Sequence, residues 1–292
     1  CNTVLISAGD VPRTGLSPRQ ILGSVSSTLH PQFEAPYGLS VQGFYALAAR
    51  AHMHEFGTTP EQLAAVAVAA REHAALHPGA ELRDPIEIRD VLESPMVADP
   101  LHALDCSLWS DGGAAVVVTG RDRARDFAQP PVWLHGIGEG HWHEHLFQAR
   151  SLVESAASES GARAYAMAGL GASDMDFAQV YDCFTSVTIV ELEDLGFCPK
   201  GEGGPFVADG HISRGGSLPV NTHGGLLCHS HTGHPGSMFA LTEAVTQLRG
   251  QAGARQLNAP DLGLVHAQGG VLSSHCTAAV SYTHLRAHET DS

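Results

Sequence analysis

One segment, Pro219–Phe239, constrains this chain more than any other. It reads P-V-N-T-H-G-G-L-L-C-H-S-H-T-G-H-P-G-S-M-F and places four histidines and a cysteine among glycines. Apolar residues three and four apart, such as Met238, Leu241 and Val245, predict a helix that begins at Gly236. A glycine turn that leads into a helix N-terminus suits an anion or a developing oxyanion. Positive φ, which brings backbone N–H groups close to a ligand, is expected at Gly224, Gly225, Gly233 and Gly236.

The overall composition limits the classes of function. The net charge of −15 over 292 residues argues against a nucleic-acid groove, which needs a basic face. No apolar run reaches the ~18–20 residues of a membrane span. The six cysteines are scattered and form no C-x-x-C pair, which predicts a reduced, cytoplasmic protein rather than a disulfide framework.

Strand and helix patterns alternate along the chain and predict an α/β fold with a mixed or parallel sheet. Gln129-Pro130-Pro131 is the expected boundary between a module at 1–130, which carries a loop insertion, and a second module at 131–280. Helices are predicted over Ser40–Phe56, from Pro60 to His77, within Ser151–Ala168, and over Phe184–Leu195. Buried strands are predicted over Val4–Ala8, Ala114–Thr119, Val132–Ile137, Phe177–Tyr181, Leu262–Ala267 and Ser274–Val280.

Three turns share one layout, in which a strand ends in polar or glycine residues. They are Tyr181–Phe184, the central segment, and His266–Gly270. Ligands bind at such strand ends in α/β sheets. Within the central segment, His231 and His234 are either an acid/base pair or two surface turn histidines.

Other side chains also have two interpretations. Tyr181 and Asp182 are a proton donor and acceptor, or a buried tyrosine and the cap of helix 184–195. Cys183 and Cys228 are nucleophiles or small core residues. Cys228, His229, His231 and His234 are metal-ligand types, but a structural zinc site needs a second ligand pair, so we expect no metal. Ser110-Asp111-Gly112-Gly113 predicts a tight turn, and a histidine-rich loop (His135, His141, His143, His145) should follow strand 132–137.

Several motifs in order resemble the thiolase superfamily, in its sterol-carrier-protein-type, lipid-transfer branch. They are S-D-G-G-A-A-V-V-V (110–118), Y-D-C-F-T (181–185), L-E-D-L-G-F-C-P-K-G-E-G-G (192–204), L-P-V-N-T-H-G-G-L-L (218–227) and G-G-V-L-S-S-H (269–275). The resemblance implies a layered α-β-α-β-α fold with an incomplete N-terminal half, a homodimer, and an acyl-CoA thioester as substrate without a further cofactor.

The resemblance also assigns site residues. His231 matches the family's catalytic histidine of the G-H-P motif, with His234 as second choice. His266 stands where the family usually has a second catalytic cysteine, and Tyr181 stands at the oxyanion-hole position. Cys183 is a second-choice site residue. Shaping of the oxyanion and substrate site is expected from Asp182, Asn221, Gly269 and Gly270.

These assignments imply an acyltransferase of the acetyl-CoA C-acyltransferase type in lipid or sterol metabolism. The family's nucleophilic cysteine should lie upstream of Cys1, so this chain by itself is expected to be inactive. Tyr181 in place of Asn or His indicates an alternative, a retro-aldolase that cleaves a β-hydroxyacyl-CoA beside a small zinc-ribbon/OB-fold partner. A non-catalytic lipid or acyl-CoA carrier is the third hypothesis. Ser281–Ser292 resembles adapter read-through and is left out of the fold.

Overall fold

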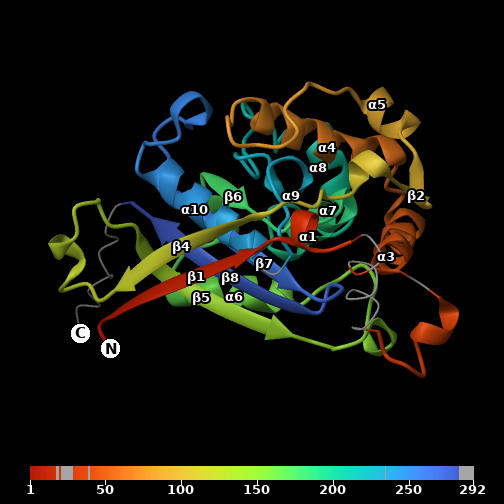
Figure 1. Cartoon of the computed structure of the whole chain (residues 1–292), viewed down its shortest axis with the longest axis horizontal. Coiled ribbons are helices and arrows are strands. Elements are labelled where there is room, and N and C mark those ends of the chain that lie inside the picture. The colour runs from red at the N-terminus through yellow and green to blue at the C-terminus, as the bar shows by residue number, and fades with distance from the viewer. Residues whose placement is uncertain (18–19, 21–28, 39, 234, 283–292) are drawn as a thin grey trace.

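The computed structural model (Figure 1) describes residues 1–17, 20, 29–38, 40–233 and 235–282. Its main sheet has four strands in the order β5-β8-β7-β6. β6 runs parallel to β7, and the other neighbours are antiparallel. These strands are β5 (Trp133–His141), β6 (Phe177–Gln179), β7 (Leu262–Gly269) and β8 (Ser274–Ser281).

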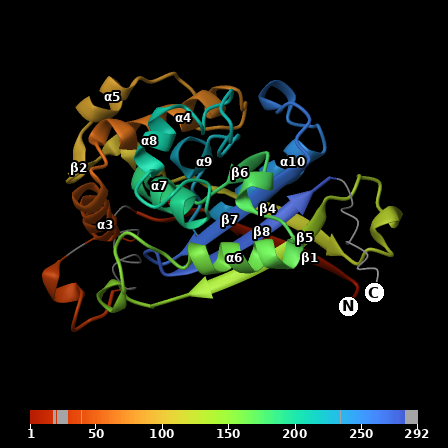
Figure 2. The same ribbon diagram turned by 180° about the vertical axis from the view of Figure 1, so that it is seen from behind.

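Helices cover both faces of this sheet and form a separate layer beside it (Figures 1 and 2). Two short strands, β2 (Met96–Ala98) and β3 (Leu101–His102), pair with each other at the edge of the helical layer. The α-helices of the described residues are α1 (Pro12–Gly15), α3 (Val41–Phe56), α4 (Pro60–Ala75), α5 (Ile88–Glu93), α6 (Ala157–Ala168), α7 (Thr185–Asp194), α8 (Gly203–Ala208), α9 (Gly225–Cys228) and α10 (Gly236–Leu248).

The alternating glycines of β5 explain why α6 lies so close to the sheet. Figure 2 shows α6 along β5 and β8. A Cβ atom on Gly136 would overlap the carbonyl oxygen of Ala164, and one on Gly138 would overlap that of Ser160. Because successive strand residues face opposite sides, glycine at every second position opens one face to the helix backbone.

The opposite face of the sheet packs against α10. Val265 and Val280 form a core cluster with Ala240 and Ala244 of that helix. His266, next to Val265, therefore points to the face that carries α6. Its cross-strand partner Thr277 donates or accepts a hydrogen bond of 2.8 Å with Ser160 on α6, which confirms the direction of this face.

Side-chain caps begin two helices of the helical layer. Ser40 Oγ accepts a hydrogen bond from the N–H of Gly43 at the start of α3. Thr59 and Gln62 form a capping box at the start of α4. The largest core cluster includes α3, α4 and α7 together with β6 and β7, so it contains residues from both sides of the expected boundary at 129–131.

The first strand pairing corrects a prediction. β1 (Thr3–Asp10) and β4 (Gly112–Thr119) form a two-stranded antiparallel ribbon, whereas both were expected to be buried. The side chains of Leu5 and Val117 are 66% and 51% exposed. A run of apolar residues predicts a buried strand only when a sheet and a covering layer surround it. The ribbon has only two strands, and among the described helices α10 approaches β4 (Figure 1).

Three local predictions were also wrong. Ser110–Gly113 is not a turn, because Gly112 and Gly113 already pair with β1, where a Cβ on Gly113 would lie 2.9 Å from the carbonyl oxygen of Ala8. His135 and His141 lie within β5 rather than in a loop, because β5 pairs with β8 as far as His141. Strand β8 extends to Ser281, and residues 283–292 of the expected tail lie outside the described residues.

Candidate functional site

The central segment folds as a turn with left-handed backbone. Gly224, Gly225 and Gly233 have φ values of 104°, 63° and 81°, as predicted, and Asn221 has a φ of 53°. Gly236 does not need positive φ, because it is the first residue of α10. His234 lies outside the described residues, so its second-choice role stays a prediction.

Two polar side chains attach this turn to the end of β6. The Asn221 side-chain oxygen accepts a hydrogen bond of 2.8 Å from the N–H of Val180. Asp182 Oδ1 accepts one of 2.7 Å from the N–H of Leu226, at the start of α9. Asp182 was expected to cap helix 184–195, but α7 begins after Phe184 without a side-chain cap. The carboxylate caps α9 instead, because Gly225 lets the turn approach it.

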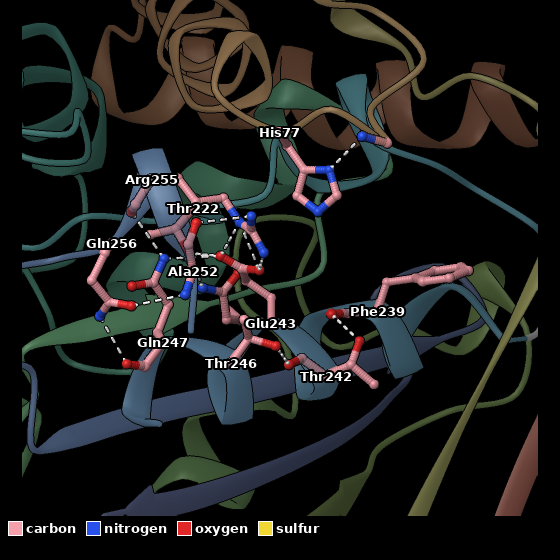
Figure 3. Close-up of polar contacts among 12 residues, drawn as sticks. His77, Thr222, Phe239, Thr242, Glu243, Thr246, Gln247, Ala252, Arg255 and Gln256 are labelled. Atoms are coloured by element: carbon pink, nitrogen blue, oxygen red, sulfur yellow. Dashed lines mark hydrogen bonds and ion pairs between the residues drawn. The ribbon is translucent and has the colours of Figure 1, made fainter. Parts of the chain in front are cut away.

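A second network holds the turn from the side of α10 (Figure 3). Thr222 donates a hydrogen bond of 2.8 Å to Glu243 on α10 and accepts one of 2.9 Å from Gln179 on β6. Arg255 pairs with the same carboxylate, 2.8 Å from Nη2 to Oε2. Both charged side chains are largely buried. The network therefore fixes the turn relative to both β6 and α10.

Tyr181 and His231 meet where the end of β6 faces the turn. The hydroxyl of Tyr181 lies 3.4 Å from Nε2 of His231, and both residues are partly exposed. The other ring nitrogen, Nδ1, lies 2.9 Å from the hydroxyl of Ser107. Burial lowers the pKa of His231 to about 4, so the ring is neutral at pH 7. Burial raises the pKa of Tyr181 well above its ordinary value, so its hydroxyl keeps its proton.

Sequence reasoning did not find Ser107 or Trp109 as part of this site. The indole of Trp109 stacks on His231 at 5.6 Å between ring centroids. Both residues lie just before the quoted S-D-G-G motif, in a segment without secondary structure. The backbone N–H of Ser110 donates to the carbonyl oxygen of His231, which brings this segment to the turn.

His266 occupies a different environment from the one expected. It was placed at a strand end, but β7 continues to Gly269, because it pairs with β8 as far as Ser274. Its side chain is fully buried. Nδ1 of His266 lies 3.0 Å from Oε2 of Glu191 on α7, and Nε2 lies 3.0 Å from Nδ1 of His275. Neither Glu191 nor His275 was singled out from the sequence.

Glu191 also connects His266 to the first pair of residues. Burial raises the pKa of Glu191 well above its ordinary value, and the nearby backbone N–H of Tyr181 opposes that shift. The structure thus brings Tyr181 into contact with His231, whereas His266 contacts Glu191, which lies near the backbone N–H of Tyr181.

Gly269 and Gly270, which were expected to shape the substrate site, lie at the end of β7, where the chain turns toward β8. Gly270 has a φ of 64°, and its carbonyl oxygen accepts a hydrogen bond of 2.8 Å from the hydroxyl of Tyr45 on α3. The Gln268 side-chain amide donates to the same hydroxyl at 2.6 Å. The ring of Tyr45 also packs against that of Phe184, with the ring centroids 4.6 Å apart and the planes tilted by 34°. These contacts tie the strand end to the helical layer next to Tyr181.

The thiols near the site are protonated. Burial raises the pKa of Cys183 well above its ordinary value, that of Cys106 to about 12 and that of Cys228 to about 11. Cys228 Sγ accepts a hydrogen bond of 3.3 Å from Arg71. A thiolate is the reactive form of cysteine, so these positions match the interpretation as core residues better than that as nucleophiles.

The described histidines and the cysteine of the central segment, which exclude His234, form no group of three donors close enough to share an ion. Within the described residues, one group of three His, Cys, Asp or Glu side chains has donor atoms close enough to share an ion, and it is Glu191, His266 and His275. Among the described helices, none combines the length and apolar character that a membrane crossing needs.

Comparison with known proteins identifies the family. Residues 138–281 match the family profile described as "Thiolase C-terminal domain-like". The chain is 39% identical to an acetyl-CoA acetyltransferase of Methanothermobacter thermautotrophicus over 248 residues, which are 85% of this chain and 65% of that protein. It is 40% identical to a steroid side-chain-cleaving aldolase of Thermomonospora curvata over 222 residues, 74% of this chain and 56% of that protein.

A solved structure, the Ltp2-ChsH2(DUF35) aldolase, matches with a TM-score of 0.85 at 34% identity, over 96% of this chain and 72% of that chain. The chain spans 65% of the length of the acetyl-CoA acetyltransferase and 56% of the length of the steroid side-chain-cleaving aldolase. The predicted α/β thiolase-like fold is therefore confirmed. This chain is also 28% identical to sterol carrier protein 2 of Rattus norvegicus over 240 residues, which are 79% of this chain and 44% of that protein. The chain belongs to the thiolase superfamily.

Proposed function

We propose that this protein acts on acyl-CoA thioesters and makes or breaks a carbon–carbon bond next to the thioester. The observation that supports this most is the pair formed by Tyr181 and His231, whose polar atoms lie 3.4 Å apart at a partly exposed strand end. Such a pair offers a protonated hydroxyl beside a neutral imidazole, which is what proton transfer around a thioester enolate requires.

The roles follow from the protonation states. With Nδ1–H donated to Ser107, Nε2 of His231 carries a lone pair and acts as the general base. Tyr181 keeps its proton and donates a hydrogen bond to the thioester oxygen as negative charge develops there. The coenzyme A thioester itself stabilises the enolate, so the proposed reaction needs no further cofactor. His266, Asp182, Asn221, Gly269 and Gly270 then support the positions of these two groups.

Acyl transfer of the thiolase type is the first candidate reaction, in line with the acetyl-CoA acetyltransferase relative. It needs a thiolate nucleophile besides the Tyr181–His231 pair. Cys183 and Cys228 do not meet this need, because both are buried and their pKa values are raised. Acyl transfer would therefore need a nucleophile other than Cys183 and Cys228.

Retro-aldol cleavage of a β-hydroxyacyl-CoA is the second candidate, and the pair of residues supports it directly. His231 accepts the proton of the β-hydroxyl group, the bond between the α and β carbons breaks, and the hydroxyl carbon becomes a ketone or aldehyde. The bonding electrons move to the α carbon and the thioester oxygen, where Tyr181 stabilises the enolate before it is protonated. No thiol is needed, and two relatives are named as aldolases.

The assembly is part of the same proposal. The solved relative is named as a complex of Ltp2 with a DUF35 partner. We propose that this chain pairs with a small zinc-ribbon/OB-fold protein of that kind and that it forms a homodimer. A carrier that binds acyl-CoA without turnover is the alternative if no reaction occurs.

The test compares two reactions with the chain alone and with such a partner. Thiolysis of acetoacetyl-CoA and cleavage of a branched β-hydroxyacyl-CoA are followed for wild type, Tyr181→Phe and His231→Gln. Tyr165→Phe is the matched control, because Tyr165 donates to the carbonyl oxygen of Leu195 away from the pair. Cleavage that falls about 10²–10⁴-fold in both site variants supports the retro-aldolase. Thiolysis that needs His231 but not Tyr181 supports acyl transfer, and CoA binding without either reaction leaves the carrier.

A further inference from the structure

The densest group of buried titratable side chains lies behind the proposed site. Glu191 on α7, His266 on β7 and His275 on β8 place donor atoms within 4.8 Å of one another. Their side chains meet on the face of the sheet that also carries α6, because His275 is two residues from Thr277, which contacts Ser160. All three residues are buried: Glu191 and His266 at 0% exposure, and His275 at 3%.

The polar atoms of this group are poorly satisfied. Both carboxylate oxygens of Glu191, Nδ1 of His266 and Nε2 of His275 have no hydrogen-bond partner among the described residues. The Nδ1–Oε2 approach of 3.0 Å between His266 and Glu191 is short but lacks hydrogen-bond geometry. An unpaired buried carboxylate costs several kcal/mol, so its charge must be neutralised by a proton or by a cation.

Among the described residues, no lysine or arginine is paired with this carboxylate. Glu191 lies against the imidazole of His266, whereas Lys200 pairs with Glu193 and Asp194. Neutral imidazole and deprotonated carboxylate are the forms that bind a metal ion.

We propose that Glu191, His266 and His275 form a binding site for a divalent cation of the Zn²⁺ class. Two imidazoles and one carboxylate suit Zn²⁺ and its neighbours in the transition series, whereas Mg²⁺ and Ca²⁺ prefer oxygen ligands alone. One ligand atom from each residue lies within 4.8 Å of the other two. The edge of a tetrahedron around such an ion is about 3.3 Å for bonds of about 2.0–2.1 Å, so the three side chains would move closer together around the ion. Binding replaces the His266–His275 hydrogen bond and leaves a fourth position open.

A cavity borders this site. It has a volume of about 620 Å³, is open to the surface, and is lined by His275, by its neighbours Ser274 and Cys276, and by Gln268. His141 and Glu139 of β5 also line it. The proposed ligand His275 therefore borders both the buried group and a surface cavity.

The experiment uses the full chain and needs no catalytic activity, so its outcome is separate from that of the proposed function. Protein stripped with a chelator and dialysed is titrated with Co²⁺, and the visible absorption of the bound ion is followed. We expect one equivalent to bind and Zn²⁺ to displace it. In Glu191→Gln and His275→Gln the affinity should fall more than about 100-fold, because loss of outer-shell partners alone costs about 10–100-fold.

His141→Gln is the matched control, because His141 lines the same cavity but is exposed and bonded to Ser274. It should bind as wild type does, which separates the site from the other histidines of the chain. Glu191→Gln removes a buried charge and is expected to fold, as circular dichroism will check. Absence of stoichiometric binding, or equal binding by wild type and Glu191→Gln, overturns the proposal and means that Glu191 is protonated instead.

Discussion

The hydroxyl of Ser107 lies 2.9 Å from Nδ1 of His231, on the side of the ring opposite to the nitrogen that faces Tyr181. A hydrogen bond to one ring nitrogen decides which proton form the other presents. Ser107 is therefore a positioning residue for His231, although it lies more than a hundred residues away in sequence.

Ser107→Ala should remove the hydrogen bond that fixes which nitrogen of His231 carries the proton and how the ring is oriented. We expect the turnover number to fall about 5-fold with KM nearly unchanged, because the hydrogen bond that orients the base contributes about 1 kcal/mol. Ser107→Thr keeps the hydroxyl and should restore most of the rate. Nitrogen-15 NMR of His231 gives an independent readout: the tautomer ratio should change in the alanine variant and not in the threonine variant. Unchanged ratios in both would remove the positioning role.

The sequence predicted the helices of this chain better than the environment of its site. Capping residues such as Ser40 and Thr59 act locally, so the start of α3 and α4 could be predicted from a few neighbouring residues. The glycines at 224 and 225 likewise predicted their own backbone conformation.

Contacts between distant segments could not be predicted in this way. Asp182 caps α9 rather than α7 because Gly225 brings the turn next to it, and no local pattern contains that approach. Ser107 reaches His231 through the fold alone, and Glu191 looked like one more acidic residue of a helix. The apolar run of β4 predicted burial that depends on neighbours beyond its own sequence.

Asp182 should make the stability of the protein depend on pH. Burial raises its pKa to about 7, against hydrogen bonds from Leu226, Leu227 and Asn221, so the folded state holds a proton that the unfolded state releases near pH 4. The contribution of this group to stability is therefore greatest below about pH 4 and is lost as the pH rises to about 7. Each unit of raised pKa corresponds to about 1.4 kcal/mol.

Asp182→Asn keeps an oxygen for the N–H of Leu226 but cannot ionise. Urea unfolding of both proteins from pH 4 to pH 8 should give a free-energy difference that moves in favour of the asparagine variant up to about pH 7 and then stays constant. Other titrating groups cancel in this difference. A difference that is independent of pH would show that folding does not raise the pKa of Asp182.

Gly225→Ala should destabilise the turn for two separate reasons. The residue has a φ of 63°, and a Cβ atom there would overlap Oδ2 of the buried Asp182. Gly210→Ala is the control, because Gly210 has a φ of 81° but no heavy atom within 4 Å of an added Cβ. The control measures backbone strain alone, about 1 kcal/mol. We expect at least about 2 kcal/mol more for Gly225→Ala in urea unfolding. Equal losses would mean that the turn moves away from Asp182 freely.

Removing Arg255 from its buried pair with Glu243 should cost far more stability than removing one partner of a surface pair of the same chain. Arg255→Ala leaves the carboxylate of Glu243 buried, with Thr222 and Gln247 as its donors among the described residues. Breaking a buried pair in this way costs about 3–5 kcal/mol. Arg89→Ala removes an exposed partner of Glu93 on α5 and should cost less than about 0.5 kcal/mol.

Because Thr222 is next to Asn221, Arg255→Ala should also loosen the turn that carries His231. Hydrogen exchange at residues 221–231 should then be faster in Arg255→Ala and unchanged in Arg89→Ala, whereas unchanged exchange in both would show that the turn is held by Asn221 and Asp182 alone.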